Sequence, residues 1–405
     1  MVVRRQARAS KSGRADPRAP DEITTVPDGR IGPDPREMLA HLLPVIATMG
    51  ITRLADITGL DRFGVPVIQA VRPQSLSNSV SQGKGRTPER AAVSAILEAA
   101  ETCFAERVAS FEIAVASADA LQVPVGWFES ALSPDASAHW RENPTAWVCG
   151  RDLISGRDHM VPFELVHTAY VEPPLPHDGL FDGSTSGLAV AFTETDAILH
   201  GVLECLERDA IAKAQRTHGF LQRNRIDPGT IEDDAARDLL QSAEDAGLLV
   251  GLWHADTAIG VPTIWCHAME RDAGQAMLVP QPADGSAASL DPRSAVCRAI
   301  EEAAQSRLAA ISGARDDMTR QYYPRYPDWA LIEAHRRLLA EGPCPVDLRR
   351  IRRHEPGAGD GWLSALLSDL SARPKTHVLV VPIGTDPLDD LAAVKVIIPA
   401  LESLH

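Results

Sequence analysis

The sequence predicts an α+β fold with mixed or antiparallel β-sheets. Long Ala- and Leu-rich helical segments are interleaved with segments of β-branched and aromatic residues, but the two kinds do not alternate as regularly as in a parallel sheet. The apolar content of 44% and charged content of 23% are typical of a globular protein. No internal sequence repeat is visible, so a solenoid or propeller is not expected.

Residues 1–34 predict a disordered N-terminal arm, and residues 35–405 predict one folded domain. The arm is rich in Arg, Ser, Ala and Pro, and no apolar segment follows its basic residues, so it does not resemble a secretory signal. No apolar run reaches the roughly 18 residues that a membrane-spanning helix needs. The six cysteines form no C-x-x-C pair. We therefore expect a cytoplasmic protein without membrane contact.

The first half of the domain predicts two helices and several strands. Thr87 is a natural N-cap, and Pro88 suits the first helical position, where its missing N–H costs nothing. The predicted elements are a helix at Pro35–Met49, strands in VPVIQAV (65–71) and SLSNSVS (75–81), a helix from Pro88 to about Arg107, a strand at Phe111–Ser117, and a hairpin in 147–166 with its turn near Ser155-Gly156.

The second half predicts three helices and further strands. Thr193 caps the first of these helices, with Asp196 three residues later, close to a capping box. The predicted elements are a helix at Glu194–Arg216, a β segment at Gly247–Met269, a helix at about 293–312 after Asp291-Pro292, a helix at Asp360–Ala372 after the PGAG turn, and strands in HVLVVPI (377–383) and VKVIIP (394–399).

Three of these helices carry polar side chains on one face of an otherwise apolar segment. The spacings i, i+3, i+4 and i+7 place such side chains on the same face of a helix. The residues are Ser94, Glu98 and Glu101 in the first helix, Glu204, Glu207 and Arg208 in the second, and Arg298, Glu302 and Gln305 in the third.

A solvated face is the ordinary interpretation of one such helix, but three in one chain favour a buried site. Buried carboxylates must be paired or bind metal, and five carboxylates here have only two adjacent arginines. Oxygen donors without His or Cys suit Mg²⁺ or Mn²⁺, whose shell is commonly completed by phosphates. The residues thus predict a Mg²⁺–phosphate enzyme without a Walker A or G-x-G-x-x-G loop. The net charge of −15 argues against a nucleic-acid binder.

The residues that carry these patterns also resemble the YcaO family, especially its TfuA-associated branch. The resemblance begins with ITRLADITGLDRFGVPVIQAVRP (51–73) and SVSQGKG (79–85) and covers the chain from about Pro35 onward. Three family motifs follow in order, namely the S-x-x-x-E-x-x-E of Ser94–Glu101, HGVLECLERDA (200–210) and RAIEEAAQSRLAAISGARDD (298–317).

The resemblance implies a role for each matching residue. Mg²⁺ would be held by Glu98, Glu101, Glu204, Glu207 and Glu302, and ATP would be contacted by Ser94, Asp196, Arg208, Arg298, Gln305 and Lys84. The catalytic residues stay unassigned. His200, one turn before Glu204, is either a general base or a hydrogen-bonded core histidine.

Two departures from the family pattern stand out. The usual Gly-Asn before the second acidic helix is replaced by Ala191-Phe192, which removes a polar group near the nucleotide. The tail ends in IIPALESLH rather than the P-x-P-x-P found in many azoline-forming members. This tail resembles the TfuA-associated branch and favours thioamide formation.

The resemblance implies ATP- and Mg²⁺-dependent activation of a peptide-backbone amide by phosphorylation of its oxygen. The product would be a thioamide or an azoline in the maturation of a ribosomal peptide or protein. The expected partners are a TfuA-like protein and a precursor peptide or protein substrate, and we leave room for a homodimer. Two alternatives remain open, namely a non-catalytic YcaO-like scaffold and a Mg²⁺-dependent lyase or synthase acting on diphosphates.

Overall fold

The computed structural model describes residues 34–401, except for 258, 273–277, 280, 319–322, 324–326, 356–360 and 384–390. The predicted arm lies outside the described residues apart from Asp34, whose side chain accepts a hydrogen bond from the Arg36 amide and caps the first helix. The PGAG turn and the last four residues also lie outside them. None of the described helices is long and apolar enough to cross a membrane.

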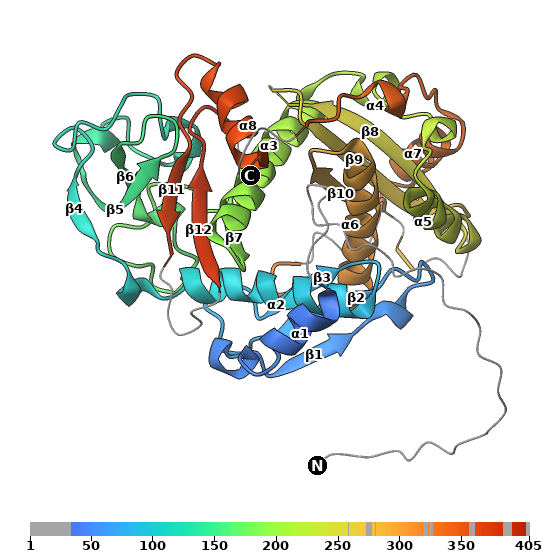
Figure 1. The fold of residues 1–405 in the computed structure, drawn as a ribbon, viewed down its shortest axis with the longest axis horizontal. Coiled ribbons are helices and arrows are strands. Elements are labelled where there is room, and N and C mark those ends of the chain that lie inside the picture. Colours follow the sequence, from blue (N-terminus) through green and yellow to red (C-terminus); the bar gives the residue numbers. More distant parts are fainter. Residues whose placement is uncertain are drawn as a thin grey trace, which may run out of the picture.

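The described chain folds into helices and strands that alternate irregularly along the sequence (Figure 1). The helices are α1 (Pro35–Leu42), α2 (Pro88–Ala105), α3 (Glu194–Arg216), α4 (Phe220–Arg223), α5 (Asp234–Asp245), α6 (Pro292–Ser312), α7 (Trp329–Glu341) and α8 (Gly361–Ser371). The strands are β1 (Arg53–Asp56), β2 (Val67–Val71), β3 (Val80–Lys84), β4 (Ala114–Ser117), β5 (Pro144–Asp152), β6 (Asp158–Pro162), β7 (Leu188–Ala191), β8 (Leu248–Asp256), β9 (Pro262–Glu270), β10 (Ala283–Ala288), β11 (Leu379–Pro382) and β12 (Ala392–Ile397).

The strands form three antiparallel sheets. Two sheets have three strands each, in the orders β1-β2-β3 and β10-β9-β8, and the third has the order β4-β5-β11-β12-β7 with β6 paired to β5. Figure 1 shows α2, α3 and α6 around the middle of the molecule, with the large sheet on one side and the β8–β10 sheet on the other. The predicted α+β class with antiparallel sheets is confirmed.

Two parts of the chain share one topology, although no sequence repeat is visible. In each part a three-stranded meander is followed by a long helix that packs on its last strand, α2 on β3 and α6 on β10. A glycine allows each close approach. A Cβ at Gly83 would lie 2.0 Å from the Ala95 nitrogen, and a Cβ at Gly285 would lie 2.3 Å from the Ala303 nitrogen.

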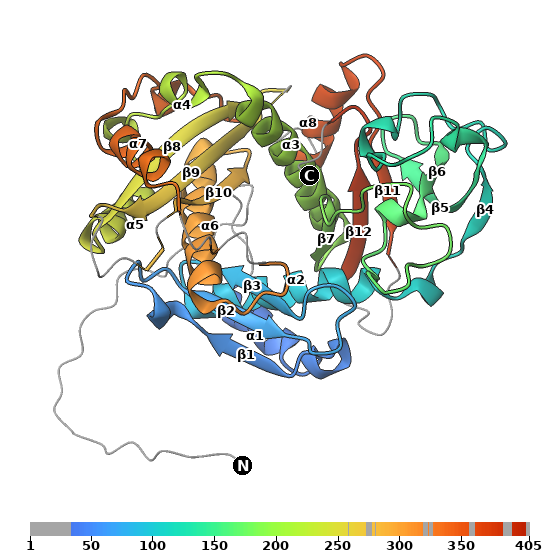
Figure 2. The same ribbon diagram turned by 180° about the vertical axis from the view of Figure 1, so that it is seen from behind.

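The second acidic helix, α3, packs against β12 and β7 of the large sheet and also contacts β10. The view from behind in Figure 2 shows α3 between the large sheet and the β8–β10 sheet. Its apolar face, which includes Val202 and Leu206, is fully buried with Val394 and Val396 of β12. Away from this apolar face, Glu207 bonds β10, whereas Glu204 bonds the Gly187 amide just before β7.

The structure confirms the three long helices and the hairpin, and it corrects two strand predictions. SLSNSVS was expected to be a strand, but β3 begins only at Val80, because Ser75 and Ser77 bond the Glu106 carboxylate in a turn. β10 has no predicted counterpart, because its sequence ADGSAA contains no β-branched or aromatic residue. It forms a strand because it pairs with β9 along its whole length, and Gly285 lets α6 lie close against it.

Candidate active site

α2 presents Ser94, Glu98 and Glu101 on its half-exposed face, as the spacing predicts. Thr87 caps the helix by accepting a hydrogen bond from the Arg90 amide, and Pro88 stands at its first position. Glu98 accepts a hydrogen bond from the Gln82 amide of β3 at 3.4 Å. The first acidic stripe is thus held against the strand that also carries Lys84.

α3 supplies the two carboxylates that the surrounding backbone fixes most firmly. Glu207 is 7% exposed, and it accepts hydrogen bonds from the Ser286 hydroxyl at 2.6 Å and from the Ala288 amide at 2.9 Å, both in β10. Glu204 accepts a bond from the Gly187 amide at 3.2 Å and pairs with Arg208 at 3.5 Å. Both side chains are therefore positioned before any ligand binds.

α6 completes the site from the opposite side. Glu302 accepts a 2.8 Å hydrogen bond from the Lys84 ammonium of β3, and both side chains are about a quarter exposed. Arg298, one turn earlier, donates to the Ala288 carbonyl at 3.2 Å. Gln305, one turn later, has a buried side-chain oxygen with no hydrogen-bond partner.

The pKa values show how crowded these carboxylates are. Burial raises the pKa of Glu101 well above its usual range, and the nearby Glu204 and Glu98 raise it further. Burial and Glu302 likewise raise the pKa of Glu207. Burial also raises the pKa of Glu98, while the nearby Arg315 and Lys84 oppose this shift.

The cationic side chains offset part of this crowding. Burial would raise the pKa of Glu302, but Lys84 and Arg208 outweigh it and hold that pKa below its usual value. Burial also opposes the charge on Arg208, yet the surrounding glutamates raise its pKa above the usual range. Arg208 thus lies in the field of Glu204, Glu207 and Glu302, which brings α3 and α6 into one electrostatic unit.

Asp196 and Phe192 lie at the start of α3. The Thr193 hydroxyl bonds the Asp196 carboxylate at 2.7 Å and accepts from its amide at 3.1 Å, so the predicted capping contact is present. Phe192 packs edge-on against His41 of α1, with ring centroids 5.8 Å apart. Burial, with Arg298 and Lys84 nearby, lowers the pKa of His200 to about 4. A neutral imidazole at this position can accept a proton or a hydrogen bond.

The donor set fits Mg²⁺ and a polyphosphate together rather than a metal alone. In the described part of the chain, no three carboxylate, imidazole or thiol groups are close enough to hold an ion by themselves. Mg²⁺ commonly takes one or two carboxylates and completes its shell with water and substrate phosphates. The buried Nε of Arg208 lacks a partner, which suits a phosphate oxygen, and the Gln305 oxygen suits a cation or a hydroxyl.

Several residues around the site have no counterpart in the sequence prediction. Ser286 orients Glu207, and Arg315 lies 4.0 Å from Glu98. Burial raises the pKa of Asp284, which also feels Glu302 and Arg208. Burial lowers the pKa of Lys395 in β12 to about 8 against the opposing effects of Cys205, Glu204 and Glu101. These residues come from strands and loops without a helical spacing, so only the fold brings them here.

Acidic side chains from three helices are interleaved with Lys84, Arg208 and Arg298. Such an arrangement can bind a polyphosphate when divalent cations lie between the carboxylates and the phosphates. Comparison with known proteins agrees. The family model described as YcaO cyclodehydratase, ATP- and Mg²⁺-binding, matches residues 82–402. A protein encoded in the tfuA 3′ region of Rhizobium leguminosarum bv. trifolii is 31% identical over 376 residues, which cover 91% of this chain and 87% of that protein.

Solved structures share the fold. YcaO from Methanopyrus kandleri, solved with AMPPCP and Mg²⁺, superposes with a TM-score of 0.68 at 21% identity, and the match covers 94% of each chain. A heterocyclase in complex with substrate and cofactor gives a TM-score of 0.73 at 19% identity, covering 95% of this chain and 55% of that one. The chain belongs to the YcaO family, and ATP and Mg²⁺ are its cofactors.

Proposed function

We propose that this protein activates a peptide-backbone amide by transferring the γ-phosphoryl group of ATP to the amide oxygen, and that the product is a thioamide. The setting is the maturation of a ribosomal peptide or protein, with a TfuA-like protein as partner. The relative encoded in the tfuA 3′ region supports a TfuA-like partner. The IIPALESLH tail, which resembles that of the TfuA-associated branch, favours the thioamide product. The family's cyclodehydratase description supports the amide chemistry.

The observation that carries the proposal is the network joining Glu204, Glu207 and Arg208 of α3 with Glu302 of α6 and Lys84 of β3. Such a network attracts a polyphosphate only when divalent cations lie between the carboxylates and the phosphates. We assign Glu98, Glu101, Glu204, Glu207 and Glu302 to Mg²⁺, and Ser94, Asp196, Arg208, Arg298, Gln305 and Lys84 to the nucleotide.

The chain's own residues then have definite tasks. Bound Mg²⁺ would neutralise phosphate charge and orient the γ-phosphoryl group. Arg208 and Arg298 can each donate two parallel N–H bonds to phosphate oxygens. Ser286 and the Ala288 amide keep the Glu207 oxygens in place, so Glu207 does not have to reorganise when the nucleotide arrives.

The test is a reconstitution of the full chain with ATP, Mg²⁺, a sulfide source, a TfuA-like protein and a candidate precursor peptide from the same genome. We expect ATP consumption and a peptide in which sulfur replaces one backbone oxygen, as identified by mass spectrometry. Loss of water from the peptide without sulfur uptake would indicate an azoline product instead. No ATP consumption under any of these conditions would favour a non-catalytic scaffold.

A further inference from the structure

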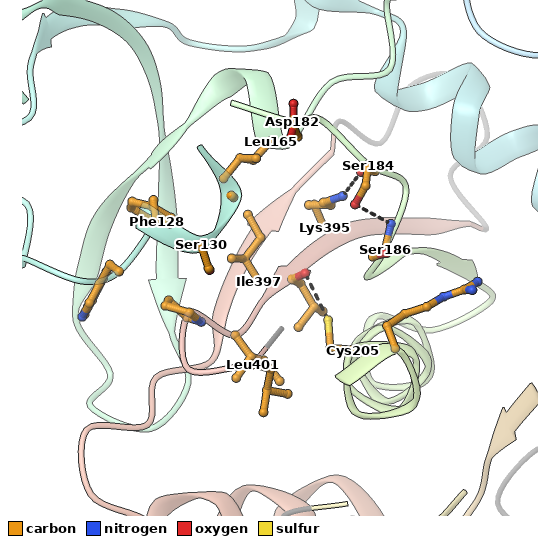
Figure 3. Close-up of a pocket in the computed structure, with 16 residues that line it drawn as sticks. Phe128, Ser130, Leu165, Asp182, Ser184, Ser186, Cys205, Lys395, Ile397 and Leu401 are labelled. Carbon is orange, nitrogen blue, oxygen red and sulfur yellow. Dashed lines mark hydrogen bonds between the residues drawn. The ribbon is translucent and has the colours of Figure 1, made fainter. Parts of the chain in front are cut away.

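A cavity of about 60 Å³ lies between β12, the loop before β7 and α3, beside the candidate nucleotide site (Figure 3). Arg208 lines it, and so does Cys205, which is next to Glu204 in the sequence. One water needs about 10–15 Å³ of such space, so the cavity holds a few heavy atoms. It is too small for a nucleotide or a folded peptide segment.

One end of the cavity holds a buried cation. The Lys395 side chain is 3% exposed, and its ammonium donates to the Ser184 carbonyl at 2.5 Å. An ammonium has three donors, and this carbonyl uses one of them. Figure 3 shows Lys395 directed toward Ser184, with Ser186 and Cys205 on the same side of the cavity. The Cys205 thiol donates a hydrogen bond to the Val396 carbonyl at 3.6 Å. It therefore keeps its proton and adds no negative charge to the cavity.

The remaining wall is mostly apolar, with Phe128 and Leu165 almost fully buried and Ile397 and Leu401 beside them. Asp182 also lines the cavity, and Figure 3 shows its carboxylate directed away from Cys205 and Ile397. A strongly hydrated anion would lose its water shell in such a space, and the apolar wall would not replace the lost hydrogen bonds. A large, polarisable and weakly hydrated monoanion loses less of its hydration. Lys395 and Arg208, which both line the cavity, are the cations available to balance it, with Glu204 and Glu101 also acting on Lys395.

We propose that this cavity binds the nucleophile of the reaction as hydrosulfide, with Lys395 as its counter-ion. The inference rests on the proposed thioamide function, because an azoline takes its nucleophile from the peptide itself. Hydrosulfide sulfur forms a bond to the amide carbonyl carbon, and the carbonyl electron pair moves to oxygen. That oxygen takes the γ-phosphoryl group and releases ADP. The C–O bond then breaks with loss of phosphate, and the sulfur-bound proton leaves as C=S forms.

The cavity can be tested without a peptide by soaking crystals of the full chain in bromide, a weakly hydrated monoanion visible by anomalous scattering. We expect a peak within hydrogen-bond distance of the Lys395 nitrogen in wild type and no peak there in Lys395→Met. A cavity without bromide in wild type, or a peak that persists in Lys395→Met, would overturn the proposal.

Steady-state kinetics test the role of the cavity separately from the proposed thioamide reaction. Lys395→Met removes the charge, and Ala131→Leu fills the space without changing any charge. Each should raise the KM for sulfide about tenfold or more, as expected for a lost charged contact. Ala131→Leu should leave the KM for ATP unchanged, and Lys375→Met, at an exposed lysine, should change neither constant.

The two failures are distinguishable. Thioamide formation with an unchanged KM for sulfide in both variants would refute the cavity as the sulfide site while leaving the proposed function intact. Azoline formation by wild type without added sulfide would refute the thioamide function, and the hydrosulfide assignment with it.

Discussion

The Lys84 ammonium lies 2.8 Å from a carboxylate oxygen of Glu302, and this contact joins the last strand of the first meander to the helix of the second. Lys84 directly follows Gly83, whose lack of a side chain lets β3 pack against α2. The close approach of strand and helix thus sets where the lysine side chain begins. The same lysine therefore balances Glu302 and lies among the candidate nucleotide ligands.

Replacing Lys84 should weaken nucleotide binding. Lys84→Met leaves Glu302 without its closest cation and removes a candidate phosphate contact, so we expect ATP affinity to fall about tenfold to 100-fold. Calorimetric titration with Mg²⁺ present measures this, with Lys375→Met as the matched control. Wild-type affinity in Lys84→Met would show that the lysine only pairs with Glu302.

Replacing Glu101 should separate stability from function. In the ligand-free protein, burial and the neighbouring carboxylates disfavour the charge on Glu101, so Glu101→Gln should leave thermal stability unchanged or raise it. The same change removes a metal-facing charge, and turnover should fall about 100-fold or more. Glu194→Gln, an exposed position on α3, is the control for thermal denaturation and ATPase assays. Full turnover in Glu101→Gln would mean that this carboxylate does not face the metal.

The raised pKa values predict opposite pH effects on the free and the bound protein. The stability that a raised folded-state pKa provides is present at low pH and is lost as pH rises through that pKa. Mg²⁺ binding needs the ionised carboxylates, so Mg²⁺·ATP should stabilise less as pH falls. Thermal denaturation from about pH 8 to about pH 6, with and without Mg²⁺·ATP, measures both trends. Glu101→Gln should make both pH trends smaller. If the stabilisation by Mg²⁺·ATP did not change with pH, the assignment of these carboxylates to Mg²⁺ would be contradicted.

Phe192 should limit ATP affinity without preventing activity. Its ring packs against His41. Because a phenyl ring has no hydrogen-bonding group, the side chain at this position offers the nucleotide no hydrogen bond. Phe192→Asn should tighten ATP binding by up to about tenfold, the value of one hydrogen bond, while losing about 0.5–1.5 kcal/mol of aromatic packing. Phe192→Leu removes the ring without adding a polar group and should not tighten binding. If neither wild type nor Phe192→Asn consumes ATP, the result would support the non-catalytic scaffold alternative.

The sequence predicted the acidic helices because their signals are local. Thr87 and Thr193 cap the first two as expected, and the i, i+3, i+4 and i+7 spacing places the carboxylates on one face. Asp291 caps the third, just before the Pro292 at which that helix begins. The strands were harder to predict. Ser75 and Ser77 lie in a segment resembling a strand, but a carboxylate 29 or more residues away holds them in a turn.

The parts of the site that the sequence did not predict depend on long-range contacts. Ser286 reaches Glu207 because β10 packs beside α3, and Lys395 lies near the site because β12 pairs with β7 beside α3. Neither residue has a characteristic spacing. Similarly, Phe192 departs from the family pattern, but its contact with His41 depends on where α1 lies.

The central claim is that divalent cations link this carboxylate cluster to ATP. The most direct measurement is calorimetric titration of the purified full chain with ATP, once in excess Mg²⁺ and once in excess EDTA. We predict binding in Mg²⁺ and a loss of affinity of about 100-fold or more in EDTA, because the uncompensated glutamates repel the triphosphate. Equal affinity under the two conditions would contradict the account.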